Sequence, residues 1–271
     1  MLLSAVFTLQ PQQPASLPVD QGRAVHGLFF DWLRQADAAL AQQVHDAEGP
    51  KPFTVSSLRG ARVEQERIPL LPQQECWFRI TTFSTELSTV LARQILPNLP
   101  PQVTLSDVPF RLVGVTTDGA EHAWAGQSDY PQMAQEIMLA PEEPSPWLNL
   151  RFGSPIAFHS QKKHVPLPLP RLAVESWLKQ WNSFAPLRLD EEANRFAEEC
   201  LAISRYRLET QAVRFGSATI VGFVGHCTYR FLNRDRYWTR VIHLLAAFSF
   251  YCGTGHKTTM GLGQSKVLSR G

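Results

Sequence analysis

The chain has few cysteines and no long hydrophobic run. Its four cysteines are far apart and form no CxxC pair, so the sequence indicates neither a zinc site nor a disulfide framework. No stretch reaches the roughly 18 uninterrupted apolar residues of a membrane span. The first residues alternate as in a strand and lack the basic and apolar regions of a secretory leader. We therefore expect a cytoplasmic protein in a reducing compartment, with no membrane partner.

The net charge is also low, at +2 for 271 residues. Overall charge therefore neither requires nor excludes a nucleic-acid partner, and the local distribution of charge has to decide. A hydrophobic content of 44% is enough for a substantial core. The length predicts one large domain or two ordinary ones.

The first half of the chain predicts one ferredoxin-like domain, at residues 1–118. Alternating apolar residues predict strands, and apolar residues three and four apart predict helices. The order of these elements, β-α-β-β-α-β, is that of the ferredoxin-like split βαβ arrangement. The expected elements are a strand at 3–9, helices at 25–36 and 37–46, strands at 53–56 and 75–83, a helix at 85–96 and a strand at 108–117.

Residues 119–146 are less periodic and contain several prolines, so they predict a linker. Residues 147–271 then repeat the order and predict a second ferredoxin-like domain. The fold class is therefore α+β, with two tandem ferredoxin-like domains. Similar sheets bind RNA in the RRM family, but its aromatic signature is absent here, so we do not expect bases to stack on the sheet. The expected elements are a strand at 147–158, helices at 172–184 and 191–201, a hairpin of 203–214 and 218–231, a helix at 236–252 and a strand at 263–268.

A glycine-rich loop near the end of the chain is the most distinctive stretch. It reads Gly253-Thr254-Gly255-His256-Lys257-Thr258-Thr259-Met260-Gly261-Leu262-Gly263-Gln264. Glycines let N–H groups approach a ligand closely, consecutive N–H groups form an anion-binding concavity, and Lys257 adds a positive charge. The spacing matches neither a P-loop nor a Rossmann fingerprint. The loop therefore predicts a phosphate site, with a helix C-cap at Gly253 and a plain turn as the alternative.

Basic residues cluster on the predicted hairpin and just beyond it. The nearby acidic residues are confined largely to the preceding helix, at 190–199, so the hairpin side is left net positive. This pattern favours an electrostatic track for a polyanion, and a solvated hairpin with scattered ion pairs is the alternative. The cluster comprises Arg205, Arg207, Arg214, Arg230, Arg234, Arg236 and Arg240.

Two of the eight histidines fall where they can share a site. A break at residues 36–37 splits the segment into two short antiparallel helices, which brings His26 near the start of one beside His45 near the end of the other. Arg23 and Lys51 flank the same end. Two imidazoles can exchange protons near neutral pH, and cations can stabilise a pentavalent phosphate, so the group suits phosphoryl transfer without a metal. The alternative is that both histidines merely favour helix ends.

Several stretches together resemble a known family. They are the glycine-rich loop, Val25 to Asp46 followed by Lys51 to Ser56, the run Ser154-Pro155-Ile156-Ala157-Phe158, and the strand Val221-Gly222-Phe223-Val224-Gly225. In their order along the chain, these segments are similar to those of the CRISPR-associated endoribonucleases that process precursor crRNA. The resemblance spans most of the chain and implies two tandem ferredoxin-like domains.

The resemblance also implies cleavage of CRISPR repeat RNA without a metal or other cofactor. A ribose 2′-OH would attack the adjacent phosphate and leave a 2′,3′-cyclic phosphate and a 5′-OH end. It implies that His45 is the general base and His26 the general acid or a phosphate ligand, with Arg23 and Lys51 offsetting negative charge. Phenylalanine stands where some members carry a tyrosine on the first helix, so a two-histidine site is expected. The expected RNA-binding residues are Gly253, Gly255, His256, Lys257, Thr258, Gly261, Gly263, Arg205, Arg207, Arg230 and Arg234.

The expected partners are precursor crRNA and a CRISPR effector complex, with the protein itself a monomer or a homodimer. Two other classes stay open. One is a repeat-RNA-binding subunit of a CRISPR ribonucleoprotein that does not cleave, which a cleavage assay on labelled repeat RNA distinguishes. The other is a nucleotide-binding enzyme that uses the glycine-rich loop, which stabilisation by ATP or GTP would reveal.

Overall fold

The computed structural model describes residues 1–160, 163–215 and 218–268. The chain divides into two compact units. The first unit comprises Met1–Ser128 and Thr259–Gly261, and the second comprises Asp129–Thr258 and Leu262–Gly271.

The division between the units falls inside the span 119–146 that the sequence assigned to a linker. That span is more than a connection, since it holds the strand β8 (Gly126–Ser128) and the helix α4 (Tyr130–Met138). Residues Thr259–Gly261 group with the first unit, although the sequence assigned the whole glycine-rich loop to the second domain. No local pattern signals that assignment, because it depends on packing against residues more than two hundred positions earlier.

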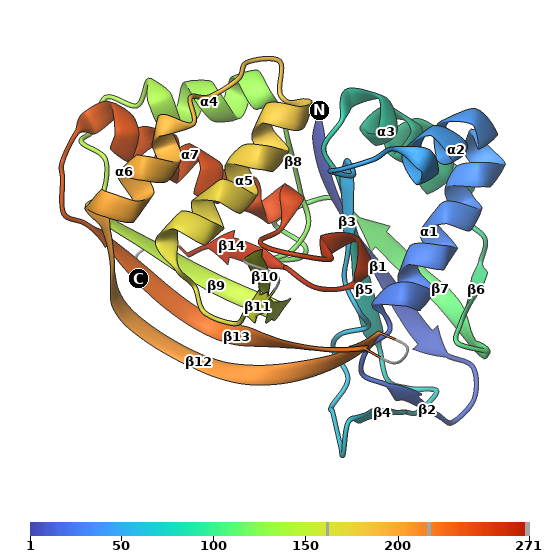
Figure 1. The fold of residues 1–271 in the computed structure, drawn as a ribbon. Helices are drawn as coiled ribbons and strands as arrows, with labels where there is room; N and C mark the ends of the chain where they lie inside the picture. Colours follow the sequence, from blue (N-terminus) through green and yellow to red (C-terminus); the bar gives the residue numbers. More distant parts are fainter. Residues whose placement is uncertain (161–162, 216–217, 269–271) are drawn as a thin grey trace. The chain divides into compact units, whose positions relative to one another are not determined.

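The first unit is built on an antiparallel sheet in the order β3-β5-β1-β7-β6, with β8 also paired to β1 (Figure 1). The side chains of β1 are almost all buried, as expected for the central strand. Strands β2 and β4 form a separate ribbon. The bounds are β1 (Leu2–Pro11), β2 (Ala15–Pro18), β3 (Phe53–Val55), β4 (Arg67–Leu70), β5 (Cys76–Thr82), β6 (Gln102–Leu105) and β7 (Val108–Thr116).

Three helices belong to the first unit: α1 (Gly22–Ala36), α2 (Ala38–Asp46) and α3 (Thr85–Val90), the last continuing through irregular turns to Asn98. Core packing joins α1 to the sheet, because Phe7 of β1 stacks on Phe78 at 4.8 Å and contacts Trp32 at 5.3 Å between ring centres. The predicted break between α1 and α2 is present. The Asp37 carboxylate accepts the N–H of Leu40 at 2.9 Å and so caps α2.

The second unit has a four-stranded antiparallel sheet in the order β12-β13-β9-β14. Its helices cover one face of the sheet (Figure 1), onto which β9 presents Leu148, Leu150 and Phe152 as buried residues. The helix α7 begins with an Asp235 cap and ends at Gly253, which has a positive φ of 72°. The bounds are β9 (Trp147–Ile156), α5 (Pro170–Phe184), α6 (Glu192–Cys200), β12 (Leu201–Phe215), β13 (Ala218–Phe231), α7 (Arg236–Cys252) and β14 (Ser265–Val267).

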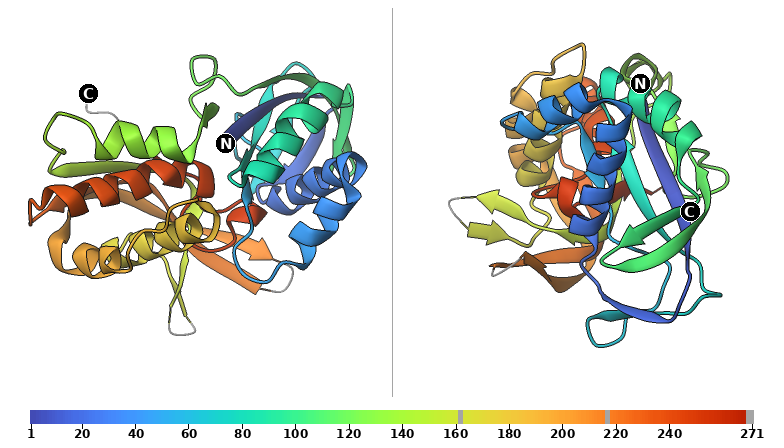
Figure 2. Two further views of the ribbon diagram at one scale, coloured as in Figure 1. Left: turned by 90° about the horizontal axis from the view of Figure 1, so that it is seen from above. Right: turned by 90° about the vertical axis from the view of Figure 1, so that its right-hand side faces the viewer.

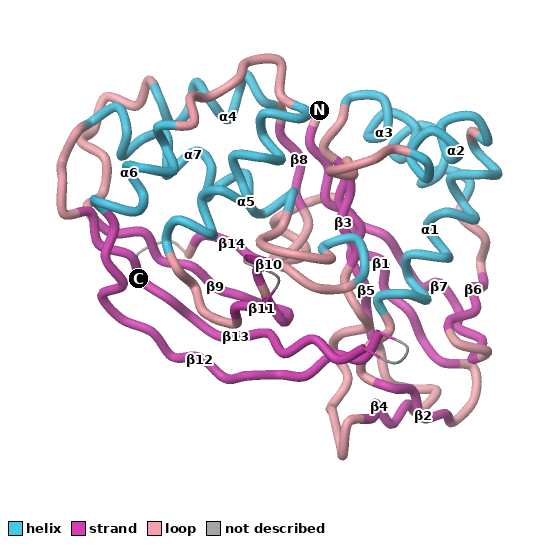
Figure 3. Tube along the Cα trace, viewed as in Figure 1, coloured by secondary structure: helices cyan, strands magenta, loops and turns pink. Residues whose placement is uncertain are grey.

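Strands β12 and β13 form a long hairpin (Figure 3) whose pairing extends beyond the last β9 residue in register, Ile156. A small apolar cluster of Ala157, Val213, Ile220 and Leu262 lies at this extended end, with Phe215 packed against it. A second, short ribbon projects from the unit in the views of Figure 2, formed by β10 (Phe158–Ser160) and β11 (Lys163–Val165). The sequence did not predict this ribbon.

The ferredoxin-like prediction is confirmed by the strand order. Numbering the four main strands of each unit along the chain gives the same spatial order, 2-3-1-4, in both. In the described part of the chain, no helix is both long enough and apolar enough to cross a membrane.

Candidate functional site

The two predicted catalytic histidines lie in the first unit around one phenylalanine. His26 is in the second turn of α1, and His45 is in the last turn of α2. The ring of Phe30 is 4.8 Å from the His26 ring and 5.9 Å from the His45 ring, measured between centres. The antiparallel arrangement of α1 and α2 therefore brings both imidazoles into contact with the same phenylalanine ring, although the two histidines lie on different helices.

His26 is held by a backbone contact from the glycine-rich loop. Its Nδ1 lies 2.9 Å from the carbonyl oxygen of Thr259. A carbonyl can only accept a hydrogen bond, so Nδ1 carries the proton and Nε2 keeps a free lone pair. The contact thus selects the tautomer that can act as a base through Nε2.

The surroundings of His26 also favour its neutral form. Burial lowers its pKa from the ordinary value; the hydrogen bond to Thr259 opposes this shift, and the positive charges of His45 and Lys51 add to it. His26 is half-buried, whereas His45 is exposed. His26 is therefore present mainly as the neutral ring at neutral pH, the form that can accept a proton.

Lys51 has a different position from the one expected. Its ammonium group donates to three carbonyls at the end of α2, those of Val44 at 2.6 Å, His45 at 2.7 Å and Ala47 at 2.7 Å. These carbonyls have no partner within the helix, so Lys51 acts as a C-terminal cap. It fixes the backbone that carries His45. Arg23 is exposed in the first turn of α1, three residues before His26, where its guanidinium group is accessible to an anion.

Two glycines allow the loop to reach His26. A Cβ on Gly22, the first residue of α1, would lie 2.1 Å from the carbonyl oxygen of Met260. A Cβ on Gly261 would lie 2.7 Å from the Ser57 hydroxyl oxygen and 2.8 Å from the Cα of Gly22. Gly261 also has a positive φ of 97° and forms a parallel bridge with Ser56. Both positions thus require glycine for close backbone packing.

The first half of the glycine-rich loop is held mainly by contacts within the second unit. The N–H of Thr254 donates to Gly263, that of Gly255 to the Ser176 hydroxyl at 2.8 Å, and that of His256 to Ala157 at 2.9 Å. The N–H of Gly263 donates to Pro155. These groups therefore do not form the open anion-binding concavity that the glycine spacing predicted.

Two side chains in this half of the loop are accessible to a ligand. His256 is exposed, and Lys257 is partly exposed with its Nζ 5.0 Å from the centre of the Phe215 ring. Thr258 is buried at the start of a short 3-10 turn. The loop thus offers one imidazole and one ammonium group, whereas the threonine is structural.

The predicted hairpin arginines form part of a wider basic surface on the open face of the second sheet. Arg207 of β12 pairs in register with His226 of β13, His226 with Arg151 of β9, and Arg151 with Lys266 of β14. Residues paired in this way share one face of a sheet, so a row of basic side chains crosses all four strands. We call these four residues the basic row.

Two further arginines border the basic row. Arg205 is exposed two residues before Arg207 on the same strand face, and Arg230 lies over the Trp147 ring at 5.3 Å. Arg234 is exposed in the turn after β13. Arg151 was missed from the sequence, although the alternation of apolar residues around it would have placed it on the open face.

Two arginines of the predicted track contact the segment between α4 and β9. Arg240 is buried and donates to the carbonyls of Met138, Ala140 and Glu142. Arg236 donates to Pro141 and lies 3.7 Å from the Glu143 carboxylate. The inclusion of Arg240 in a polyanion track was therefore wrong, because its side chain is buried against the segment between α4 and β9, whereas Arg236 stays exposed.

Comparison with known proteins identifies the family. The model for CRISPR-associated endoribonuclease Cas6 matches residues 150–265, and the model for the CRISPR Cas6 N-terminal domain matches residues 1–135. A product complex of Thermus thermophilus Cas6 is 27% identical, with 99% of this chain and 100% of that chain covered and a TM-score of 0.81. A second Cas6 product complex is 30% identical, with the same coverage and a TM-score of 0.79. The chain belongs to the Cas6 family.

The resemblance to crRNA-processing endoribonucleases is thereby confirmed. A Streptococcus thermophilus protein described as CRISPR-associated endoribonuclease Cas6 is 28% identical over 131 residues, which are 48% of this chain and 54% of that protein. This chain therefore matches about half the length of that relative, whereas it covers the whole of the Thermus Cas6 structure.

Among the residues that the structure describes, no group of three or more histidine, cysteine or acidic side chains is arranged to hold a metal ion. The described cysteines are free, and burial raises the pKa of the Cys76 and Cys227 thiols to about 12. These thiols are therefore not nucleophiles at neutral pH.

Proposed function

We propose that this chain is an endoribonuclease that cleaves CRISPR repeat RNA in precursor crRNA, by attack of a ribose 2′-OH on the adjacent phosphate without a metal ion. The products would be a 2′,3′-cyclic phosphate and a 5′-OH end. The observation that carries the proposal is the hydrogen bond between His26 Nδ1 and the Thr259 carbonyl. His45 lies beside the same Phe30 ring that His26 contacts. Family membership supports the substrate class.

Two properties of His26, its hydrogen-bonded Nδ1 and its lowered pKa, support a specific assignment of roles. His26 Nε2 would take the proton from the 2′-OH as the ribose oxygen forms its bond to phosphorus. The bond from phosphorus to the 5′ oxygen would break, and the protonated ring of the exposed His45 would donate a proton to that leaving oxygen. This reverses the roles implied by the family resemblance, because the fixed Nδ1–H tautomer and lowered pKa of His26 suit a base.

The cations near the site would have separate tasks. Arg23, exposed at the start of α1, would offset the charge that develops on the phosphate, helped by the N-terminal end of the helix. Lys51 would act as a positioning residue, since its ammonium group is engaged with the carbonyls that precede and follow His45.

RNA binding would involve the second unit as well. We assign it to His256 and Lys257 of the glycine-rich loop and to the exposed arginines Arg205, Arg207, Arg230 and Arg234. The glycines Gly253, Gly255, Gly261 and Gly263 would contribute by allowing the backbone of the loop to pack closely. A CRISPR effector complex would receive the processed RNA.

The test is cleavage of end-labelled repeat RNA in excess EDTA, with a matched substrate that carries a single 2′-deoxyribose at the scissile position. We expect full cleavage of the ribose substrate and none of the deoxy substrate. Cleavage of the deoxy substrate, or a strict need for a divalent ion, would refute the mechanism. Tight binding with no cleavage of any repeat RNA would instead identify a subunit that only holds RNA.

A further inference from the structure

Three histidines of the second unit meet at one place on its surface. They come from β10, β11 and the glycine-rich loop, and their ring centres are 5.7, 6.1 and 6.0 Å apart, which is nearly an equilateral triangle. All three side chains are exposed. We call this set the histidine triangle: His159, His164 and His256.

Local structure explains why the three rings converge. His159 and His164 are directly paired across the β10–β11 ribbon and so lie on the same face of it. The N–H of His256 donates to the carbonyl of Ala157, the residue just before β10, at 2.9 Å. A Cβ on Gly255 would lie 2.6 Å from that same carbonyl oxygen. The loop therefore approaches the base of the ribbon closely enough to bring the third imidazole beside the other two.

The triangle lies in a part of the chain that is poor in carboxylates. The sequence has no aspartate or glutamate from residue 144 to 174, nor from 236 to the end. Lys257 follows His256 directly, and Arg214 is exposed near the end of β12, whereas Lys163 points to the opposite face of the ribbon.

The neighbouring elements add little negative charge. The paired end of β13, residues 218–225, carries no charged side chain. Helix α5 contacts the loop through the Ser176 hydroxyl and brings exposed Glu175 beside that contact, with Arg171 and Lys179 on the same helix. The triangle thus combines three imidazoles with a net positive surrounding.

The charged form of His256 is disfavoured in this cluster. Partial burial of the ring, then the charges of Lys257, His164 and His159, lower the pKa of His256. A phosphate group bound over the triangle would accept hydrogen bonds from the protonated rings and remove their mutual repulsion. Phosphate oxygens can accept hydrogen bonds from several imidazole N–H groups at once, and the described residues show no arrangement suited to a metal ion here.

We propose that His159, His164 and His256 form a phosphate-binding site for the RNA strand, and that binding there is coupled to protonation of the histidines. RNA affinity then falls as the pH rises through the range in which imidazoles lose their protons. The inference rests on the proposed function in one respect, namely that the polyanion bound by this chain is RNA.

The experiment measures binding of a short, fully 2′-O-methylated RNA, which 2′-OH attack cannot cleave, between about pH 5.5 and about pH 7.5 at constant ionic strength. For the wild type, log Kd should rise with pH. In the triple variant His159→Gln/His164→Gln/His256→Gln, the slope of log Kd against pH should fall by about one unit or more, since each linked proton contributes up to one unit. His26 and His45 are retained in every protein, so their contribution is common to all.

Two matched variants sharpen the result. Lys163→Gln removes a charge from the other face of the same ribbon, and it should leave the slope unchanged. His256→Lys supplies a permanent charge, and it should retain affinity at the highest pH while losing part of the slope. Thermal unfolding of each variant confirms that it is folded.

An unchanged slope in the folded triple variant would overturn the inference, as would an equal loss of slope in Lys163→Gln. The outcome is separable from that of the cleavage assay. A protein that binds the methylated RNA with the expected pH dependence but cleaves no repeat RNA would support the histidine triangle and refute the proposed activity.

Discussion

The two units share one strand order but place their polar side chains at different positions. In the first unit, the functional candidates lie at helix ends, where His26 and His45 meet around Phe30. In the second unit, they lie on the strands and loops, in the basic row and the histidine triangle. The comparison shows that a ferredoxin-like topology does not by itself select a site, because function depends on which positions carry the chemistry.

The difference extends to charge. From Cys200 to the end, the chain contains ten lysines and arginines but only two acidic residues, Glu209 and Asp235. The site of the first unit has fewer cations, and one of them, Lys51, is engaged with backbone carbonyls. We therefore assign the proton transfers to the first unit and most of the attraction for a polyanion to the second.

The strongest test of this assignment removes the imidazoles of the first unit. His26→Ala and His45→Ala should each lower the single-turnover cleavage rate by about 10²–10⁴-fold, the usual contribution of a general acid or base. RNA affinity should change by less than about threefold, since the cations of the second unit remain. Gln42→Ala, an exposed change on the same helix as His45, is the control. Equal losses of binding and cleavage would show that the histidines hold RNA instead.

The next largest effect should come from the contact that joins α1 to the loop. Gly22→Ala would place a Cβ 2.1 Å from the Met260 carbonyl oxygen, whereas a Cβ on Gly27 of the same helix meets nothing within 4 Å. Gly22→Ala should displace Thr259 from His26 and lower the cleavage rate by about 10²-fold, as small misplacements of catalytic groups do. Gly27→Ala should retain activity and gain up to about 1 kcal/mol in unfolding free energy. If both variants cleave equally well, the loop contact has no role in catalysis.

These two predictions also separate the features that the sequence alone predicts from those that it does not. The alternation of apolar residues predicted the main strands of both sheets, and the Asp37 cap predicted the turn that brings His26 and His45 together. Both signals are local, since they depend on residues within one or two turns of chain. The positions of the histidines followed from them.

The remaining features depend on contacts that local patterns do not encode. Thr259 is 233 residues from His26, so no spacing rule predicts their hydrogen bond. Glycine spacing indicated close approach to the backbone, but the partner proved to be protein rather than phosphate at Gly255 and Gly261. Arg240 was similarly ambiguous, because an arginine on an apolar helix is recognised as structural only when its carbonyl partners are known.

A smaller effect should distinguish two roles for Lys51, a helix cap and a direct phosphate ligand. Lys51→Met removes hydrogen bonds to three carbonyls at the end of α2, so it should lower the unfolding free energy by about 1–3 kcal/mol and reduce cleavage through the position of His45. Lys179→Met, an exposed change on α5, is the control and should be near neutral. Urea unfolding and single-turnover cleavage measure the two effects. A large loss of cleavage with unchanged stability would make Lys51 a direct phosphate ligand.

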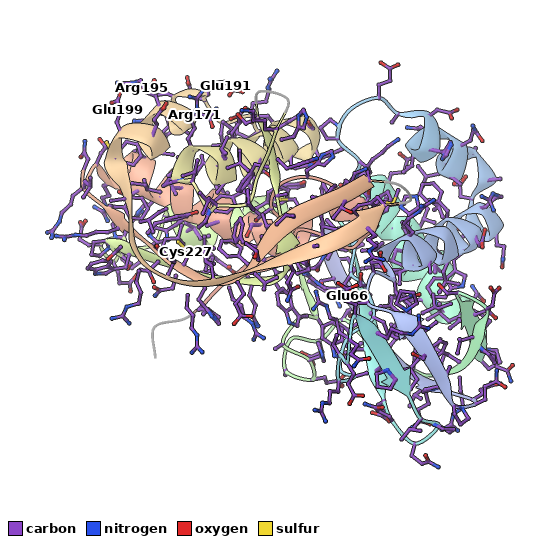
Figure 4. The ribbon with its side chains drawn as sticks, turned by 60° about the horizontal axis from the view of Figure 1, so that its bottom comes forward. Glu66, Arg171, Glu191, Arg195, Glu199 and Cys227 are labelled. Atoms are coloured by element: carbon purple, nitrogen blue, oxygen red, sulfur yellow. The ribbon has the colours of Figure 1, made fainter. Side chains whose placement is uncertain are left out.

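The basic row offers a test within the second unit. Arg151→Gln with Arg207→Gln removes two charges from the open face of the sheet, whereas Arg171→Gln with Arg195→Gln removes two from α5 and α6. The latter pair lies among Glu191 and Glu199 (Figure 4), with Arg171 3.3 Å from Glu198 and Arg195 3.1 Å from Glu199. If the row contacts single-stranded RNA, the slope of log K against log salt should fall by about 1.4 in the first variant. It should stay nearly unchanged in the second. Equal slopes would mean that only net charge matters.

The smallest expected effect concerns the protonation of His26 itself. Its pKa is lowered in the folded chain, so the neutral ring stabilises the fold above about pH 6.5, the ordinary value. That contribution is lost as the pH falls from there through the folded pKa. His26→Gln should therefore make stability less sensitive to acid, as measured by urea unfolding across this range. In the wild type, ring signals in nuclear magnetic resonance should show His26 titrating below its ordinary value with the proton on Nδ1. A proton on Nε2, or a raised pKa, would return the role of base to His45.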